Sequence, residues 1–383
     1  MGEKIDHLKM TFSSIPGLSE IKSTLIKAVQ ANHIAHAQLF AGQPGALNLP
    51  LALAYVTYLH CQNKKDNDAC GTCPACSKSL KFIHPDTSFV FPFSNVKNDK
   101  DEDRFKAEIV KTWRSFLLEQ PFGDLGNWIS YYGGEDKQAL ISREESREII
   151  KTLSLKPFES PFKIMIIWQP EWMHPSAANG ILKILEEPPA NTFFILISNA
   201  TEKLLPTILS RTQIVLVPML TDDELGNYLA EKGYPDEGRT REAIRMAEGD
   251  INFALKRMEL EEDSFQDRFV EWMRSCHKKD YVSLVAIAEG FHELDKLGQR
   301  GFLHYSNGLM RETLLYSVGA KAISRARGSE ADFLQNFNKV MSVEKVDKAC
   351  NLLNEASYHV ERNGSAKMIF LDLSIQLSQI IKG

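Results

Sequence analysis

Short, continuous apolar runs in the middle of the chain place the strongest constraint on the fold. They lie at Lys163–Trp168, Phe193–Ser198 and Gln213–Val217, and each has the length of a strand without polar alternation. Strands that are apolar on both faces are typical of a parallel sheet covered by helices on both sides. Another short strand is expected at Gln38–Phe40, between two stretches with helical spacing. The first half of the chain therefore predicts an α/β domain built on a parallel sheet.

Strands disappear from the pattern after about residue 221. Short helices are expected at Asp222–Lys232 and Arg239–Ala247, and longer helices follow from about residue 264 to the end. The last of them, Ser365–Ile381, is apolar over much of its surface, which suits core burial and also a contact between subunits. The pattern predicts an α/β domain, a small helical domain and a larger all-α domain, at residues 1–218, 219–262 and 263–383.

The stretch at about 92–137 departs from the alternation and is interpreted as an insertion between core elements. It opens with a run of mixed charge at Lys97–Lys106. Six aromatic residues follow: Trp113, Phe116, Phe122, Trp128, Tyr131 and Tyr132. We expect the charged run to form a solvated loop and the rings to pack the insertion onto the domain. Stacking of nucleic-acid bases on these rings is the alternative, although the rings lack a surrounding basic groove.

Four of the six cysteines fall within 16 residues, in a module at about 60–80. They are Cys61, Cys70, Cys73 and Cys76. Two-residue gaps let neighbouring sulfurs converge on one ion, and four thiolates suit Zn²⁺ in a closed, structural site. The metal would stabilise the polar segment between Cys61 and Cys70, which makes a poor core. An iron–sulfur cluster and four unrelated thiols are the alternatives, and Cys276 and Cys350 are interpreted as ordinary thiols.

The turn after the first expected strand lies where a phosphate-binding loop would be, but it lacks the residues that such a loop needs. The pattern is G-x-x-x-x-G-K-[ST]. The first glycine, Gly42, is present, and Gly45 lies within the loop. Leu47 stands at the second glycine, Asn48 at the lysine, and Leu49 at the hydroxyl that holds magnesium. The loop has therefore lost the glycine that lets the backbone approach the phosphates, the lysine that faces them, and the hydroxyl that binds magnesium.

A second loss follows the run at Lys163–Trp168. An acidic pair normally ends such a strand and holds the metal, but Trp168 and Gln169 stand in its place. Glu171 comes two or three positions late and is expected at a helix entry or at the surface. Two altered sites indicate a nucleotide fold without its nucleotide. On the loop alone, a chain that never had such a fold is an equal alternative.

Several segments together resemble the AAA+ clamp-loader subunits of bacterial DNA polymerase III. The opening Phe12-x2-Ile15-x-Gly17 and the run His36–Gly45 are similar to the start of these proteins, and the cysteines sit where the family inserts a zinc module. Ser176–Pro189 is similar to the family's most recognisable motif. Leu205–Thr212 looks like its Ser-Arg-Cys element, with Thr212 in place of the cysteine.

This resemblance covers roughly residues 10–80 and 140–260. It implies an AAA+ domain, a helical lid, and a helical collar domain that joins a five-subunit ring with ATPase subunits of the gamma/tau type and a delta subunit. The assembly would load a sliding clamp onto primed DNA. The chain itself is expected to bind structural Zn²⁺ but no ATP, and to have no ATPase activity of its own.

The resemblance also implies that Arg211 reaches the ATP site of a neighbouring subunit as an arginine finger, because a guanidinium can neutralise charge that develops on the γ-phosphate. A surface arginine near a helix C-terminus is the alternative. Asn252 falls where family ATPases carry a lid arginine, which would be a third lost nucleotide contact.

Two other functional classes stay open: an active ATPase subunit, and a zinc-dependent nucleic-acid-binding module. The net charge of −5 argues against the second. The longest apolar runs fall well short of the roughly 20 residues of a membrane-spanning helix. The polar start of the chain shows no signal peptide, so we expect a cytoplasmic protein without a membrane partner.

Overall fold

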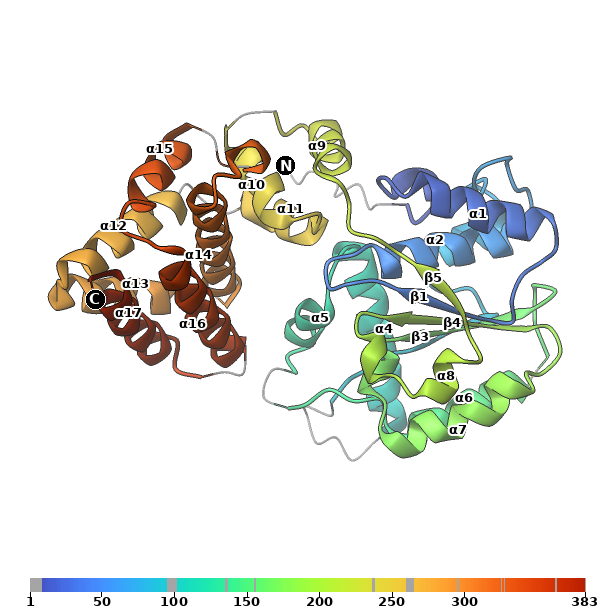
Figure 1. The fold of residues 1–383 in the computed structure, drawn as a ribbon. Coiled ribbons are helices and arrows are strands. Elements are labelled where there is room, and N and C mark those ends of the chain that lie inside the picture. Colours follow the sequence, from blue (N-terminus) through green and yellow to red (C-terminus); the bar gives the residue numbers. More distant parts are fainter. Residues whose placement is uncertain are drawn as a thin grey trace, which may run out of the picture. The chain divides into compact units, whose positions relative to one another are not determined.

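The centre of the first part of the chain is a parallel sheet of five strands (Figure 1). The computed structural model describes residues 9–94, 102–134, 137–154, 156–235, 238–259, 265–294, 296–324, 326, 328–361 and 364–382. The strands are β1 (Ala37–Ala41), β2 (Thr87–Val90), β3 (Lys163–Trp168), β4 (Thr192–Ser198) and β5 (Gln213–Leu216). Their order is β2-β3-β4-β1-β5, and every neighbouring pair is parallel. The expected α/β class with a parallel sheet is confirmed.

Helices cover both faces of this sheet. Neighbouring strand residues such as Leu39 and Phe40 belong to opposite hydrophobic clusters, as the period of two requires. The helices on the face of Phe40 are α1 (Ser19–Gln30) and α2 (Asn48–His60), and those on the face of Leu39 are α6 (Arg143–Ser154), α7 (Pro175–Glu186) and α8 (Pro206–Leu209). The result is three layers, visible in Figure 1.

The edge strand β5 contradicts the expectation that all three apolar runs are buried on both faces. Ile214 is 49% exposed and Leu216 is 73% exposed. All of β3, by contrast, is buried. β5 pairs with β1 alone, and an apolar run does not reveal whether its strand lies at the centre or the edge of a sheet.

The insertion leaves the sheet after β2 and returns close to the point where it left. Phe93 and Leu140 exchange two backbone hydrogen bonds of 3.3 and 3.2 Å, which close its base. Between them lie α4 (Glu102–Glu119) and α5 (Leu125–Tyr131). Residues 95–101, which include half of the predicted charged run, lie outside the described residues, as do 135–136. The other half, residues 102–106, lies in α4 and not in the expected loop, and its Phe105 is buried.

The aromatic residues of the insertion pack inward. Trp113, Phe116 and Trp128 are at most 1% exposed, and the indole N–H of Trp128 donates to the carbonyl of Pro92 at 2.7 Å. The Trp113 ring stacks on Phe91 with 4.4 Å between centroids. The expectation that these rings pack the insertion onto the domain is confirmed for Trp113, Phe116 and Trp128, whose buried faces are closed to bases, whereas Phe122, Tyr131 and Tyr132 are half-buried.

In the described residues that follow the sheet, all regular elements are helices. The first three are α9 (Asp222–Glu231), α10 (Gly238–Ala247) and α11 (Ile251–Glu259). The chain divides into two units, Met1–Lys256 and Arg257–Gly383. The second unit contains α12 (Phe265–Lys278), α13 (Tyr281–Glu293), α14 (Lys296–Ser317), α15 (Gly328–Phe337), α16 (Val343–Glu361) and α17 (Ala366–Lys382). The predicted domain limits at 218/219 and 262/263 stay predictions.

The second unit has an aromatic core of its own. The indole N–H of Trp272 donates to the Ser374 hydroxyl at 2.8 Å, and Phe291 stacks on Phe370 with 4.2 Å between ring centroids. Much of the apolar surface of α17 is used in this core, since Phe370, Leu373 and Leu377 are buried. Among the described helices of both units, none combines the length and the apolar character that a bilayer crossing demands.

Candidate functional site

Three loops meet at the edge of the sheet where the strands end. Because the strands are parallel, their carboxyl ends share one edge, and ligands of such sheets bind there. The degenerate phosphate loop begins at Gly42 after β1, Gln169 follows β3, and Asn199 follows β4. The structure therefore brings the residues predicted for a nucleotide site together.

Asn48, at the lysine position of the loop, is built into the fold. It is 3% exposed. Its Nδ2 donates to the carbonyl of Ser198 at 3.0 Å and to the side-chain oxygen of Asn199, and its Oδ1 accepts the Leu49 N–H at 3.1 Å. Leu47 and Leu49 are buried as well. Asn48 thus ties α2 to the end of β4, and the three altered positions present neither a cation nor a hydroxyl to a phosphate.

The positions of the missing acidic pair are also used for packing. Trp168 is 2% exposed, and its ring lies 4.9 Å from that of Trp113 in the insertion. Gln169 is buried, and its backbone N–H donates to the carbonyl of Ile197 at 2.8 Å. Glu171, at the helix entry as expected, accepts the backbone N–H of Asn199 at 2.9 Å. Burial raises the pKa of this carboxyl.

Asp250, just before α11, lies against the degenerate phosphate loop, and Asn252 of α11 lies nearby. Gly45 has a φ of +90°, and a Cβ placed on it would lie 2.7 Å from the carboxylate of Asp250. Burial raises the pKa of Asp250, and the nearby charge of Asp124 adds to the effect. Asn252, at the position of the family's lid arginine, donates to the side-chain oxygen of Asn127 at 2.8 Å. A phosphate would meet a carboxylate here.

The cavity left between these loops is about 20 Å³, which is room for about one water molecule. Pockets for small-molecule ligands usually measure about 300–1,000 Å³. Phe122, Gly123 and Asp124 of the insertion line the cavity together with Leu47 and Trp168. The chain's own side chains thus occupy the place where a nucleotide would bind.

Sequence reasoning missed this role of the insertion. The dense aromatic residues indicated packing but not where the insertion packs. The contacts join residues far apart in the sequence, so no local spacing reveals them. The glycine of the sequence Phe122-Gly123-Asp124 was a weak signal of a tight turn, since a Cβ there would lie 2.6 Å from the Phe116 ring.

Arg211 lies in the turn between α8 and β5. Its side chain is 29% exposed and forms an ion pair with Glu186 at the end of α7. Its Nη1 donates to the carbonyl of Thr207 at 2.9 Å and to the hydroxyl of Ser210 at 3.3 Å. Arg211 is therefore held at the surface, away from the degenerate loop, and next to the exposed residues of β5.

The four cysteines of the predicted metal site converge. Their sulfurs all lie within 4.8 Å of one another, and the Cys70 and Cys76 sulfurs are 3.9 Å apart. Zn–S bonds of about 2.3 Å in a tetrahedron separate sulfurs by about 3.8 Å. Cys61 follows the last residue of α2, and Cys73 caps α3 (Pro74–Ser79). The cluster could hold one metal ion.

Backbone amides already point at the sulfurs. The N–H groups of Cys70, Cys73 and Cys76 donate to the preceding cysteine of the cluster at 3.2, 3.3 and 3.4 Å. Hydrogen bonds from the Thr72 and Cys73 amides lower the pKa of Cys70 to about 6, whereas burial raises the pKa of Cys61 and of Cys76. Metal binding would therefore release protons from the buried thiols.

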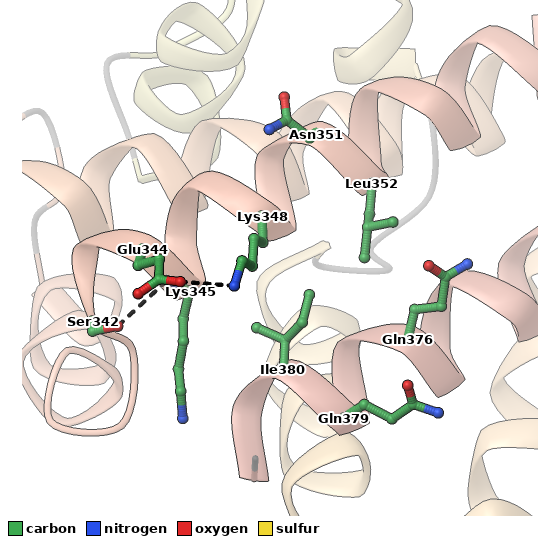
Figure 2. Close-up of a pocket in the computed structure, with 9 residues that line it drawn as sticks. All are labelled: Ser342, Glu344, Lys345, Lys348, Asn351, Leu352, Gln376, Gln379 and Ile380. Carbon is green, nitrogen blue, oxygen red and sulfur yellow. Dashed lines mark hydrogen bonds and ion pairs between the residues drawn. The ribbon is translucent and has the colours of Figure 1, made fainter.

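A larger cavity, about 650 Å³, lies in the second unit between α16 and α17 (Figure 2). Its cationic groups are already engaged within the protein. Lys348 forms an ion pair of 2.8 Å with Glu344, and Lys345 donates to the carbonyl of Ile381 at 3.0 Å. We therefore do not assign a ligand to this groove.

Comparison with known proteins identifies relatives of the first unit. A family model described as DNA polymerase III, delta subunit, matches residues 17–221, more than half of the chain. The DNA polymerase III subunit delta' of Escherichia coli K12 is 23% identical over 231 residues, which are 60% of this chain and 57% of that protein. The delta' subunit of Pseudomonas aeruginosa is 29% identical over 182 residues, 48% of this chain and 42% of that protein.

Similarity extends to subunits with other names. The DNA polymerase III subunit gamma of Buchnera aphidicola is 22% identical over 253 residues, 65% of this chain and 58% of that protein. A solved structure of a DNA polymerase III gamma subunit-related protein from Thermotoga maritima is 16% identical with a TM-score of 0.41, and covers 93% of this chain and 99% of that one. The chain spans between 25% and 58% of the length of the first curated relatives that it matches.

Proposed function

The chain belongs to the DNA polymerase III delta subunit family, and from this premise we propose that it is a non-catalytic clamp-loader subunit of the delta-prime type. In this proposal it has an AAA+ domain, a helical lid and a collar domain. It assembles with gamma/tau-type ATPase subunits and a delta subunit in a ring of five, and it helps ATP-driven loading of the sliding clamp onto primed DNA.

One observation carries the non-catalytic part of the proposal: the nucleotide position is filled. A cavity of about 20 Å³ admits no triphosphate, and the lysine position is an asparagine bonded to Ser198. Binding Mg·ATP would require the insertion to leave a cluster of buried rings. Calorimetry of the purified chain with Mg·ATP should therefore detect no binding, and micromolar affinity would overturn the assignment.

Two features support Arg211 as the residue that acts on a neighbour. Its guanidinium lies at the surface, where an ion pair with Glu186 and hydrogen bonds to Thr207 and Ser210 restrain it. Surface ion pairs contribute about 0–1 kcal/mol, so a phosphate can replace the carboxylate at small cost. The strand that begins two residues later exposes Ile214 and Leu216, an apolar edge that a neighbouring subunit would bury.

We assign zinc to the cysteine cluster, with Cys61, Cys70, Cys73 and Cys76 as ligands in a closed structural site. Four thiolates around one ion leave no open position for a substrate, so the metal would stabilise the module and take no part in chemistry. Sulfurs this close suit one ion better than an iron–sulfur cluster, in which the ligands bind different iron atoms.

The test is reconstitution with the partner subunits and measurement of ATP hydrolysis stimulated by clamp and primed DNA. Arg211→Ala should lower the stimulated rate about tenfold or more, while the assembly elutes at the same size. Arg211→Lys should recover little, because lysine lacks the planar fork of donors.

Two controls separate the proposed role from a structural one. Glu186→Ala breaks the same ion pair but keeps the guanidinium, so stimulated hydrolysis should be retained. Leu216→Asp should weaken assembly itself, because it places a charge in the apolar edge. Full stimulated activity of Arg211→Ala in an intact assembly would remove Arg211 from the proposal.

A further inference from the structure

The insertion and the helices after the sheet meet where a nucleotide would otherwise lie. The Phe122 ring meets the Tyr228 ring of α9 edge to face, with centroids 5.8 Å apart. Asn127 of α5 accepts a hydrogen bond from Asn252 of α11. The segment Phe122–Asn127, which comprises a turn and the first three residues of α5, therefore contacts both α9 and α11 and is called the bridging turn below.

Asn127 makes hydrogen bonds both within the bridging turn and to α11. Its Oδ1 accepts the Asp124 N–H at 3.0 Å and the Asn252 Nδ2 at 2.8 Å. Its own N–H donates to Asp124 Oδ1 at 2.8 Å, which completes a capping box at the start of α5. One amide oxygen thus fixes the shape of the bridging turn and its link to α11.

The other side of the bridging turn is anchored to the sheet. Trp128, which follows the turn, meets Trp113 edge to face with 5.0 Å between ring centroids, and Trp113 in turn packs against Trp168 at the end of β3. These rings are buried and leave the turn little freedom. A continuous set of contacts runs from β3 through the insertion to α9 and α11.

We propose that the bridging turn replaces a nucleotide as the connection between the sheet and the α9–α11 segment. A bound nucleotide joins the elements on both sides of it as long as it is bound, and it is lost by dissociation. The bridging turn is covalently part of the chain, so its connection is permanent. The α9–α11 segment then keeps one position on the sheet whether or not ATP is present.

Other attachments have to be separated in the test, and Asp250, directly before α11, lies against Gly45 of the loop. The carboxylate of Glu224 at the start of α9 accepts the Leu18 N–H at 3.3 Å. This contact holds the first turn of α9 but does not reach Asn252. Amide protons of α11 therefore report on the bridging turn more directly than those at the start of α9.

The experiment is hydrogen–deuterium exchange of the full chain, with and without Mg·ATP. The test variant is Phe122→Ala with Asn127→Ala. Amides of α11 and the end of α9 should exchange about tenfold faster, because an aromatic edge contact and a hydrogen bond together contribute roughly that factor. Amides of β1, β3 and β4 should keep their protection.

Two further variants keep the test decisive if the double variant folds poorly. Asn252→Ala removes the link to α11 but leaves the capping box intact, and it should raise exchange in α11 about threefold. Tyr131→Phe is the control, because it removes a bond to Glu119 at the far end of α5 and should leave α11 unchanged.

The outcomes separate this inference from the proposed function. Unchanged exchange of α11 in both test variants would overturn the bridging role, whatever Arg211 does. If Mg·ATP slowed exchange in wild type, the claim of a fixed segment would fail as well. If Mg·ATP restored protection only in the double variant, the bridging role would stand, and the proposed loss of the nucleotide site would be wrong.

Discussion

The cysteine cluster and the degenerate phosphate loop are opposite kinds of site within one unit. In the cluster, every predicted ligand is present, and the sulfurs converge within 4.8 Å around space for one ion. At the loop, the chemical groups are missing, and a cavity of about 20 Å³ is all that is left. The cysteine cluster is arranged around space for a metal ion, whereas the space at the phosphate loop is filled by side chains of the protein itself.

In the proposed function, the loop has lost a nucleotide site while the chain has kept its fold. Removal of a lysine or a hydroxyl alone would leave a solvent-filled cavity at the end of the sheet. Here Asn48 bonds to the end of β4, and aromatic rings of the insertion pack against Trp168. Contacts within the protein thus replace those that a ligand would make.

The largest expected effect concerns the cluster. Cys76→Ser should abolish stoichiometric zinc and destabilise the module, because a structural metal contributes directly to folding. The loss should be several kcal/mol, which lowers the melting temperature of a unit of this size by roughly 10 °C. Metal analysis and thermal unfolding measure the two effects.

Cys350→Ser is the matched control for that experiment. Cys350 is half-buried in α16 of the second unit and takes no part in the cluster. Its substitution should change neither metal content nor melting temperature appreciably. Retention of one zinc per chain by Cys76→Ser would show that the four thiols do not act as one site.

The next effect concerns the lysine position of the loop. Asn48→Lys restores the residue of a working phosphate loop, but it places an ammonium where the side chain is 3% exposed. An unpaired buried charge and overpacking should cost about 3 kcal/mol or more. Thermal unfolding with and without Mg·ATP should show this loss and no rescue by the nucleotide.

Asn48→Ala separates the lost hydrogen bonds from the added charge. It removes the bond to Ser198 and should cost about 1–2 kcal/mol. A clear rise in the melting temperature of Asn48→Lys on addition of Mg·ATP would mean that missing groups alone, and not the filled space, prevent binding.

A third prediction compares one glycine from each region. Gly45 has a φ of +90° and lies against Asp250, whereas Gly71 in the cluster has a φ of +72° and open space around it. Gly71→Ala should cost about 1 kcal/mol for its backbone conformation alone. Gly45→Ala should cost about 2–3 kcal/mol, since it also displaces a buried side chain. Equal losses of unfolding free energy for the two variants, measured in urea, would show that Asp250 does not pack closely against Gly45.

Local spacing made one of these regions predictable. The spacing of Cys70, Cys73 and Cys76 already predicts convergence, because cysteines separated by two residues in a tight turn can direct their sulfurs to one ion. The run Lys163–Trp168 likewise predicted β3 to the residue. Structural features that depend on residues close together in the sequence can therefore be predicted from it.

The filled loop was not predictable in the same way. Its contacts join Phe122 to Tyr228 and Asn127 to Asn252, pairs that lie more than 100 residues apart. Sequence reasoning identified the missing groups but not the residues that replaced them. β2 was missed as well, because only its last residue is fully buried and its four residues show little apolar pattern.

The smallest expected change in stability is at Asp250, where a substitution should stabilise the protein and not destabilise it. Its carboxylate accepts the Phe253 N–H at 3.0 Å, and Asn accepts that bond equally well. Burial and the charge of Asp124 raise its folded pKa above the ordinary value of 3.8, more than Lys256 lowers it. The folded state thus holds this proton more tightly than the unfolded chain does, so its contribution to stability falls as pH rises from 3.8 through the folded pKa.

Asp250→Asn removes that loss and should stabilise the protein at neutral pH by about 1 kcal/mol. The gain should shrink as pH falls through the folded pKa and vanish below 3.8, because the wild-type carboxyl is then protonated in both states. Asp223→Asn, at an exposed position of α9, should show no such gain. Denaturant unfolding at several pH values measures the trend, and a variant that is less stable than wild type at pH 7 would mean that the attraction of Lys256 for the carboxylate outweighs its burial and the repulsion by Asp124.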